Sequence, residues 1–399
     1  MKFFNNKKDS QTDSTALAFD FGTSSVKILA CRYGEEGVEI LGGKKVLYPK
    51  DVYFGDGSFH PERAELALKE GVNALLAELQ LAPINRAAVG ISNGKVEGYS
   101  SKITYRRANS EKKISDAEYQ NILKLVENRA DQIMRRMISW ELGENQQIAL
   151  ISSEILDLTL DGYSVTSVTG STGTKLEFIV YNGYAERSAS QSIMGMLKGL
   201  GLEVKITTPT IYSALRNIAD SFGPDTSACL IDMGDKVSEV GIILSGRIMG
   251  HIPFDVAGGS FTKNIANALD RDEDEAAMLK LGFAAGKIPK ALADEIHEQI
   301  ATDCKVFVSG VELILSEFPG VQQVPPLICL CGGGSVLPGV LASLQSAEWK
   351  SKLVRAKNIR VQHIKPEHLK KYSDVSGKLG SPADIGALSV AIDSADLFA

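Results

Sequence analysis

Two Asp-x-Gly turns carry the residue types that best suit phosphate chemistry in this chain. Asp20-Phe21-Gly22 ends one apolar run, Asp232-Met233-Gly234 ends another, and each turn is followed by a second apolar run. A phosphate chain reaches backbone N–H groups closely only where the turn residues are small, so glycine favours this approach. The repeat therefore predicts two phosphate-binding hairpins, in two halves of similar fold that face each other across a nucleotide cleft.

The first turn offers several groups that suit a nucleotide with Mg²⁺. Gly22, Thr23 and Ser24 supply N–H and hydroxyl donors for phosphate oxygens. Asp20 suits Mg²⁺ held through water, and Lys27 adds a positive charge. Gly, Asp and Ser are ordinary turn residues, so one such turn taken alone is more often a plain hairpin.

A third element favours the nucleotide interpretation. The apolar run Ile328–Cys331 ends in Gly332, Gly333, Gly334 and Ser335, where bare backbone can lie flat against a purine. Two such hairpins followed by strand-Gly-Gly-Gly-Ser resemble the actin-like ATPase superfamily, and the resemblance covers most of the chain. It implies an α/β protein with the actin-like (duplicated ribonuclease H-like) two-lobe fold and ATP between the lobes.

Composition narrows the function classes. The 399 residues carry a formal net charge of −6, which argues against a nucleic-acid partner because counterion release needs a basic face. The basic cluster Tyr105-Arg106-Arg107 is therefore interpreted as solvated surface. The five cysteines and five histidines show no metal-ligand spacing, and the metalloprotease and serine-hydrolase motifs are missing. No apolar run reaches the ~18 residues of a membrane span, so we expect a cytoplasmic protein.

The order of apolar and polar stretches predicts the domain organisation. Residues 1–14 are polar and are expected to form a disordered tail. Ser115-Asp116-Ala117-Glu118 is a capping box, which predicts that a long helix starts there and that Ser115 and Glu118 bond each other's backbone N–H groups. The other expected parts are the first lobe's N-terminal part (15–83), an inserted small α+β subdomain (84–170), the continued first lobe (171–222), the second lobe (223–370) and a C-terminal return to the first lobe (371–399).

Further stretches resemble FtsA, the bacterial cell-division protein, and its relative PilM of type IV pilus assembly. They are Val89-Gly90-Ile91-Ser92, Ile114-Ser115-Asp116, Gly258-Gly259-Ser260-Phe261-Thr262 and Ser381-Pro382-Ala383-Asp384-Ile385-Gly386-Ala387. The FtsA resemblance implies an ATP-binding homopolymer at the inner face of the cell membrane that recruits FtsZ, and at most a weak ATPase. The alternative is a PilM-like cytoplasmic component of pilus assembly, attached to the membrane through a partner. The insert and the total length favour FtsA, whereas the ending Leu397-Phe398-Ala399, without a visible tethering helix, favours PilM.

The same resemblance assigns roles to single residues. Phosphate contacts fall on the first turn and on Gly234, and Asp20 and Asp232 lie near Mg²⁺ through water. Lys280 reaches the ribose, and the glycine run lies against adenosine. The expected cofactor-binding residues are Asp20, Gly22, Thr23, Ser24, Lys27, Asp232, Gly234, Lys236, Gly258, Gly259, Lys280, Gly332, Gly333, Gly334 and Ser335.

Three departures from the family pattern concern the nucleotide. Lys236 stands where a further glycine is usual, so its side chain either adds charge to the nucleotide or obstructs it. Thr208-Pro209 replaces the Glu or Gln that orients the attacking water, so we expect slow or absent hydrolysis. Ala277 replaces an acidic residue that precedes the ribose lysine. Together they leave open a degenerate scaffold that keeps the fold without nucleotide.

A kinase is the enzyme alternative. The opening Asp20–Lys27 also resembles the start of sugar kinases of the same superfamily. Such an enzyme needs a carboxylate in the cleft that accepts the proton of the substrate hydroxyl. The second hairpin offers Glu239 for this role, but no sugar-binding block accompanies it.

Overall fold

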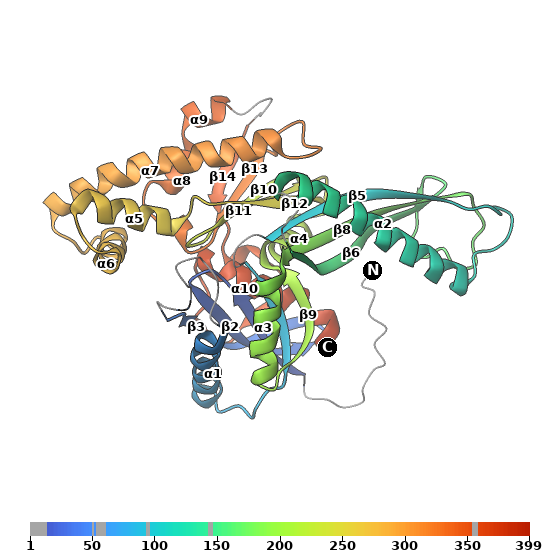
Figure 1. The fold of residues 1–399 in the computed structure, drawn as a ribbon, viewed down its shortest axis with the longest axis horizontal. Helices are drawn as coiled ribbons and strands as arrows, with labels where there is room; N and C mark the ends of the chain where they lie inside the picture. The colour runs from blue at the N-terminus through green and yellow to red at the C-terminus, as the bar shows by residue number, and fades with distance from the viewer. Residues whose placement is uncertain (1–13, 50–51, 53–60, 93–95, 143–146, 353–357) are drawn as a thin grey trace.

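The computed structural model describes residues 14–49, 52, 61–92, 96–142, 147–352 and 358–399. Apart from Ser14, the predicted tail of residues 1–14 lies outside the described residues. The described chain forms two lobes and an insert that extends to one side (Figure 1). There are two mixed β-sheets in the described residues. A six-stranded sheet forms the centre of the first lobe, and a nine-stranded sheet runs through the second lobe and the insert.

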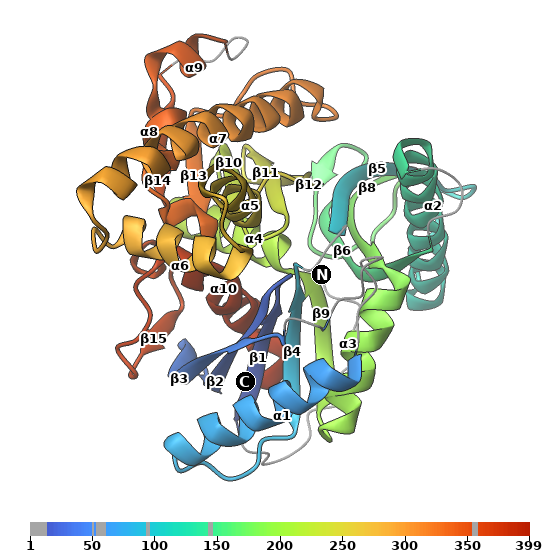
Figure 2. The same ribbon diagram turned by 60° about the vertical axis from the view of Figure 1, so that its left-hand side comes forward.

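The six-stranded sheet is the centre of the first lobe. Its order is β15-β3-β2-β1-β4-β9, with β1 antiparallel to β2 and parallel to β4. The strands are β1 (Thr15–Phe21), β2 (Ser25–Gly34), β3 (Gly37–Leu47), β4 (Arg86–Ile91), β9 (Glu203–Pro209) and β15 (Tyr372–Asp374). Helices cover both faces of this sheet, namely α1 (Pro61–Glu78) and α3 (Arg187–Gly199) on one and α10 (Ile385–Asp393) on the other (Figure 2).

Alternation along β1 explains why its sequence is almost continuously apolar. Leu17 and Phe19 pack in the cluster that contains α1 and α3, while Ala16 and Ala18 pack in the cluster that contains α10. All four side chains are fully buried. A strand covered on both faces has no solvent face that would select polar residues.

The second lobe repeats the strand arrangement of the first. The order β12-β11-β10-β13-β14 matches β3-β2-β1-β4-β9 strand for strand, with the same parallel and antiparallel pairings. The strands are β10 (Ala228–Met233), β11 (Ser238–Leu244), β12 (Arg247–Phe254), β13 (Leu327–Cys331) and β14 (Arg360–His363). This duplication confirms the predicted two-lobe, ribonuclease H-like fold.

Helices surround the repeated sheet and join the lobes. The second-lobe helices are α5 (Gly258–Leu269), α6 (Glu273–Ala284), α7 (Lys290–Glu317), α8 (Val340–Gln345) and α9 (Ala347–Lys352). Helix α4 (Thr210–Phe222) packs against α10 and also against β11 and β12, so it crosses between the lobes. The chain ends in the short helix α11 (Ala395–Phe398). Within the described residues, every helix is too short or too polar to span a membrane.

The insert extends the second-lobe sheet. It consists of β5 (Val96–Arg106), α2 (Asp116–Leu142), β6 (Ile148–Leu160), β7 (Tyr163–Ser164) and β8 (Lys175–Glu186). Its strands continue the nine-stranded sheet in the order β12-β5-β8-β6-β7. The join is narrow, because only Gly250 with Tyr99 and His251 with Gly98 pair across it.

Strand pairing differs from the expected domain boundaries at two places. The expected insert began at residue 84, but β4 lies inside the first-lobe sheet, between β1 and β9. The continued first lobe was expected from residue 171, but β8 lies between β5 and β6 of the insert. The reason is that apolar strands in sequence carry no mark of the sheet they join, which their long-range partners decide.

Two local expectations in the insert were wrong in part. The Ser115 hydroxyl accepts from the Glu118 N–H at 3.2 Å, which is half of the predicted capping box. The Glu118 carboxylate instead accepts from Arg107 Nε at 2.7 Å and Nη2 at 3.1 Å, a two-point bond to a cation that is stronger than a bond to a neutral N–H. Arg107 is therefore 6% exposed, not part of a solvated cluster.

Candidate nucleotide-binding cleft

A cavity of about 590 Å³ lies where the two hairpins and the glycine run meet. Residues of both lobes line it. Twelve of the expected cofactor-binding residues are in its wall, namely Asp20, Gly22, Thr23, Ser24, Lys27, Asp232, Gly234, Gly258, Lys280, Gly332, Gly333 and Gly334. These residues come from segments that are far apart in sequence, so the fold gathers them at one place.

The two Asp-x-Gly turns have the same backbone geometry. Gly22 N–H donates to the Ser25 carbonyl at 3.0 Å, and Gly234 N–H donates to the Val237 carbonyl at 3.1 Å. They also touch, because the Lys236 N–H donates to the Thr23 hydroxyl at 3.2 Å. The cavity therefore lies beside a direct contact between the lobes.

Close approach of the loops explains the glycines of the third element. Gly332 has a φ of +88°, and a Cβ there would overlap the Asp232 carboxylate and the Met233 carbonyl. A Cβ on Gly334 would lie 2.7 Å from Met233 Cγ and 2.9 Å from the Gly234 carbonyl oxygen. Side chains at these positions would push the run away from the second hairpin, so the cavity wall requires glycine here.

Asp20 is fixed by three neighbours in the first lobe. Its Oδ1 accepts from the Ser92 hydroxyl at 3.0 Å and from the Thr210 hydroxyl at 2.9 Å. Its Oδ2 lies 3.9 Å from Lys27 Nζ, which also donates to the Ala383 carbonyl. The carboxylate is thus held at the cavity wall by β4, by the start of α4 and by its strand neighbour on β2.

Two carboxyl groups of the cavity wall, Asp232 and Glu239, have a raised pKa, first because they are buried and then because other carboxylates lie nearby. Burial raises the pKa of Asp232 to about 7, with smaller contributions from the charges of Glu239 and Asp20. Burial also raises the pKa of Glu239 to about 8, followed by the charge of Asp20. Glu239 lies directly opposite Asp232 in the β10–β11 pairing. A cation near these groups would relieve the repulsion.

These groups fit a Mg²⁺ ion that phosphates help to hold. Among the described residues, three or more His, Cys, Asp or Glu side chains nowhere gather to hold a metal by themselves. Mg²⁺ bound with nucleotide commonly uses one or two carboxylates together with phosphates and water. Asp20 and Asp232, both in the cavity wall, suit that arrangement.

Three expected residues do not line the cavity. Lys236 contributes its backbone N–H to Thr23, as described above. Gly259 packs against the turn of the second hairpin, where its N–H donates to the Asp235 carbonyl at 2.6 Å. Ser335 is fully buried, and its hydroxyl donates to the Gly332 carbonyl at 2.7 Å. The last two shape neighbouring loops, so any contact they make to a ligand is indirect in this arrangement.

Lys280 lines the cavity but already has protein partners. Its Nζ donates to the Gly258 carbonyl at 2.6 Å and to the Thr262 hydroxyl at 2.5 Å. Burial lowers the pKa of this lysine, and the nearby charge of Asp235 opposes that shift. Ala277 also lines the cavity, one turn before Lys280.

Sequence reasoning missed a group of lysines at the cavity wall. Lys44 and Lys45 at the end of β3, and Lys378 before α10, line the cavity. Lys45 is directly opposite Lys27 in the β2–β3 pairing, and its pKa is lowered by partial burial and then by the charge of Lys27. Like charges in such a pair repel each other, and an anion between them would relieve this. The two adjacent lysines at the end of this strand were the available signal.

A second cavity, of about 410 Å³, lies between the insert and the first lobe. One wall is the β6 segment Leu150–Glu154, and the other is the β9 segment Val204–Thr208. Thr208, expected to mark the place of a water-orienting residue, faces this second cavity and does not line the first. Thr210, at the start of α4, acts on the first cavity indirectly, because its hydroxyl donates to Asp20 in the cavity wall.

Comparison with known proteins agrees with this geometry. No family model matches the sequence. The cell division protein FtsA of Enterococcus faecalis is 22% identical over 351 residues, which cover 82% of this chain and 74% of FtsA. A chain of the PilM–PilN type IV pilus biogenesis complex superposes with a TM-score of 0.67 at 17% identity, covering 95% of this chain and 98% of that one.

Fold and cleft together define an actin-like protein of two duplicated lobes. The sequence is similar to that of FtsA, and the fold is similar to that of the chain from the PilM–PilN complex.

Proposed function

We propose that this protein is an ATP-binding actin-like adaptor that works at the inner face of the cell membrane and joins a partner of division or pilus assembly. The observation that carries the proposal is the cavity in which both hairpins and the glycine run meet. The twelve expected residues in its wall supply backbone N–H donors and place Lys27 opposite the Asp20 carboxylate. The glycine run adds backbone without side chains, against which a purine can lie.

The roles within the cavity follow from the chemistry of each group. Gly22, Thr23 and Ser24 bind phosphate oxygens, with Lys27 as the nearest positive charge. Mg²⁺, when bound beside Asp20 and Asp232, neutralises phosphate charge. Slow hydrolysis is part of the proposal, because no Glu or Gln occupies the start of α4.

The partner site proposed here is the second cavity. The described strands leave β9 at the edge of its sheet, and β6 pairs on its outer side with β7 only at Thr159 and Leu160. The two free edges face each other across the cavity. An extended segment can bond such an edge through its backbone, while pockets beside the edge select its side chains.

Calorimetric titration of Mg·ATP tests the nucleotide part of the proposal. We expect binding by the wild type and weakening by about tenfold or more in Lys27→Ala, because a charge-assisted bond is worth roughly 1.5–3 kcal/mol. Lys236→Ala is the matched control from the second hairpin, and we expect it to bind like the wild type. No binding by any of the three proteins would favour the degenerate scaffold and reject the proposal.

Two peptides from the same organism test the partner part and separate the two branches. One is the C-terminal peptide of FtsZ, and the other is the N-terminal peptide of the pilus protein PilN. Binding of the first alone supports the division role, and binding of the second alone supports the pilus role.

Pelleting with ATP tests the proposed homopolymer in parallel, and flotation with lipid vesicles tests membrane attachment.

A further inference from the structure

A row of buried side chains leads away from the wall of the nucleotide cleft. Glu239 lines the cleft and is 4% exposed. Its Oε1 lies 3.4 Å from His251 Nδ1, and His251 Nε2 lies 3.0 Å from the Tyr181 hydroxyl. Burial lowers the pKa of His251 to about 3, so the imidazole is neutral and has one donor and one acceptor for these neighbours.

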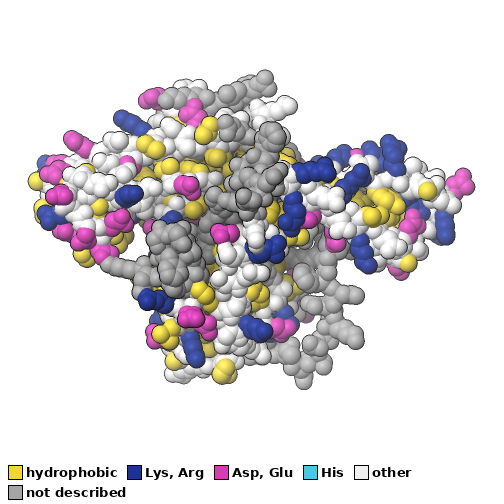
Figure 3. All heavy atoms as spheres, in the orientation of Figure 1, with side chains coloured by type: hydrophobic (Ala, Val, Ile, Leu, Met, Phe, Trp, Pro, Cys, Tyr) yellow, Lys and Arg dark blue, Asp and Glu magenta, His cyan; other side chains and the backbone are white. Residues whose placement is uncertain are grey.

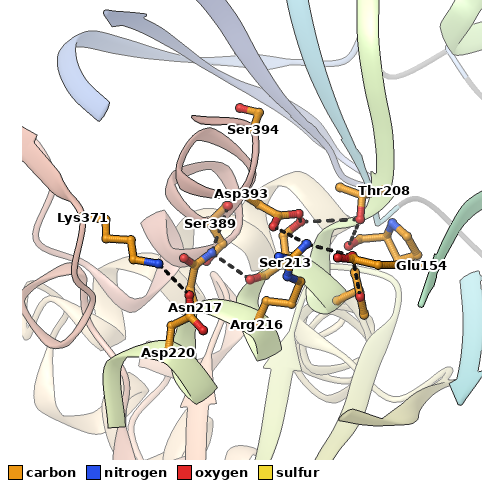
Figure 4. A network of polar contacts seen from close by, with 12 residues as sticks. Glu154, Thr208, Ser213, Arg216, Asn217, Asp220, Lys371, Ser389, Asp393 and Ser394 are labelled. Carbon is orange, nitrogen blue, oxygen red and sulfur yellow. Dashed lines mark hydrogen bonds and ion pairs between the residues drawn. The ribbon is translucent and has the colours of Figure 1, made fainter. Parts of the chain in front are cut away.

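The row continues to the second cavity. The ring of Tyr181 stacks on that of Tyr212, with centroids 3.7 Å apart and planes 11° apart. The Tyr212 hydroxyl donates to Glu154 Oε2 at 2.9 Å, and both Glu154 and Tyr212 line the second cavity. Figure 4 shows Glu154 in a polar network with Arg216 and Asp393, where Arg216 Nη1 lies 2.8 Å and 2.9 Å from the two carboxylates.

Each member of the row belongs to a different element. His251 is on β12 of the second lobe, Tyr181 on β8 of the insert, Tyr212 on the crossing helix α4, and Glu154 on the free edge β6. The row therefore crosses the narrow join between β12 and β5 and ends at the strand edge that lines the second cavity. Movement of one of these elements relative to the next therefore changes these contacts, and packed interiors rearrange between discrete arrangements rather than deform smoothly.

Glycines make the central contact possible. Gly98 is paired with His251 across the join, and a Cβ on Gly98 would lie 2.7 Å from His251 Nε2 and would overlap the Tyr181 hydroxyl. A Cβ on Gly183 would lie 2.9 Å from the same hydroxyl. The absence of a side chain at Gly98 and Gly183 thus leaves the space that the hydrogen bond between His251 and Tyr181 needs.

The contact nearest the cleft, between Glu239 and His251, is the one whose hydrogen bonding can change. Among the described residues, Glu239 Oε1 and His251 Nδ1 have no hydrogen-bond partner, and their separation of 3.4 Å is long for a hydrogen bond. A ligand in the cleft meets the Glu239 side chain, and a small displacement either completes this bond or opens it. The ligand therefore has different contacts in the two arrangements, which a conformational shift requires.

We propose that the row His251–Tyr181–Tyr212–Glu154 couples the two cavities, so that a nucleotide in the cleft changes the β6 and β9 edges at the second cavity. The inference rests on the proposed function for the identity of the cleft's ligand. Coupling of this kind is reciprocal, so a partner at the second cavity changes nucleotide affinity by the same factor. Couplings of this type usually amount to about 5–150-fold.

Hydrogen exchange measured on the full chain tests the coupling. Exchange at Leu150–Glu154 and Val204–Thr208 is compared with and without a non-hydrolysable ATP analogue and Mg²⁺. Tyr181→Phe removes the bond to His251, and Tyr212→Phe removes the bond to Glu154, while both keep the ring stack. Tyr163→Phe is the matched control, since Tyr163 is in the same insert and is 78% exposed. Calorimetry on each protein verifies that the nucleotide is bound.

We expect nucleotide to change exchange at both edges by at least about fivefold in the wild type and in Tyr163→Phe. The change should fall below about twofold in Tyr181→Phe and in Tyr212→Phe, although both still bind nucleotide. Unchanged edges in nucleotide-bound wild type would overturn the coupling, even if a variant fails to fold. A full response in both row variants would also overturn it. Absence of nucleotide binding by the wild type would instead reject the proposed function, and the coupling with it.

Discussion

The buried imidazole of His251 makes the stability of the fold sensitive to acid. Its pKa is lowered to about 3 by burial, whereas an unfolded chain has a histidine pKa near ~6.5. Between these values the unfolded state binds a proton that the folded state does not, so stability falls as the pH drops from about 6.5 towards 3. The slope is about 1.4 kcal/mol per pH unit for one such group, or about 2 kcal/mol between pH 6.5 and 5.

We expect His251→Gln to lose this part of the acid dependence. The measurement is the free energy of urea unfolding at pH 5 and pH 7, for the nucleotide-free protein. Glu239 remains in both proteins, and its raised pKa acts in the opposite direction, since it lowers stability as the pH rises. His297→Gln is the control, because His297 is exposed on α7. An unchanged pH dependence in His251→Gln would show that the imidazole accepts a proton without cost.

At the scale of elements, Arg216 of the crossing helix α4 forms ion pairs with both β6 and α10. Its guanidinium bonds Glu154 of β6 at 2.8 Å and Asp393 of α10 at 2.9 Å, and those carboxylate side chains are 12% and 5% exposed (Figure 4). The Ser213 hydroxyl also donates to Asp393, at 3.0 Å. Removal of the cation leaves two nearly buried carboxylates without their shared partner, which is costly in a protein interior.

We expect Arg216→Met to lower the free energy of unfolding by about 3 kcal/mol. Lys371→Met is the matched control in the same region. The Lys371–Asp220 pair is 2.9 Å long, but its side chains are 64% and 57% exposed, and exposed pairs contribute less than about 1 kcal/mol. Urea unfolding of both variants measures the difference. Equal losses in the two would contradict the role given to Arg216.

Across the whole molecule, charge is unevenly distributed. On the face shown in Figure 3, Lys and Arg side chains gather over the insert, while many Asp and Glu side chains lie at the far end of the second lobe. The first turn of α6 contributes Glu273, Asp274 and Glu275 to the acidic end. Opposite charges at the two ends favour head-to-tail contact between copies, which generates an open filament when the contact does not close into a ring.

We therefore expect the proposed self-association to weaken as salt rises from about 0.05 M to about 1 M, since the screening length falls to ~3 Å. Sedimentation with Mg·ATP measures the associated fraction. Glu273→Lys/Glu275→Lys should reduce it further, while Glu35→Lys/Glu36→Lys, with the same net charge change in the exposed β2–β3 turn, should not. Association that is indifferent to salt and to both variants would contradict this electrostatic account.

The sequence by itself determined the elements whose chemistry is local. A turn that admits phosphate needs Gly and small hydroxylic residues within a few positions, so Gly22, Thr23 and Gly234 identify both hairpins. The glycine run marks the third loop for the same reason, and the order of the three elements predicted the duplicated fold. The long helix α2 followed from its start signal, which is also a property of neighbouring residues.

Only the tertiary structure decided which distant segments meet. It placed β4 in the first-lobe sheet and joined the insert to the second lobe through β5 and β12. It also brought Tyr181 to His251 and turned Thr208 towards the second cavity. Each of these contacts joins positions far apart in the chain, where neither residue carries a local signal of its partner. The sequence therefore showed which loops could bind a nucleotide, and packing alone created the second cavity and the buried row that leads to it.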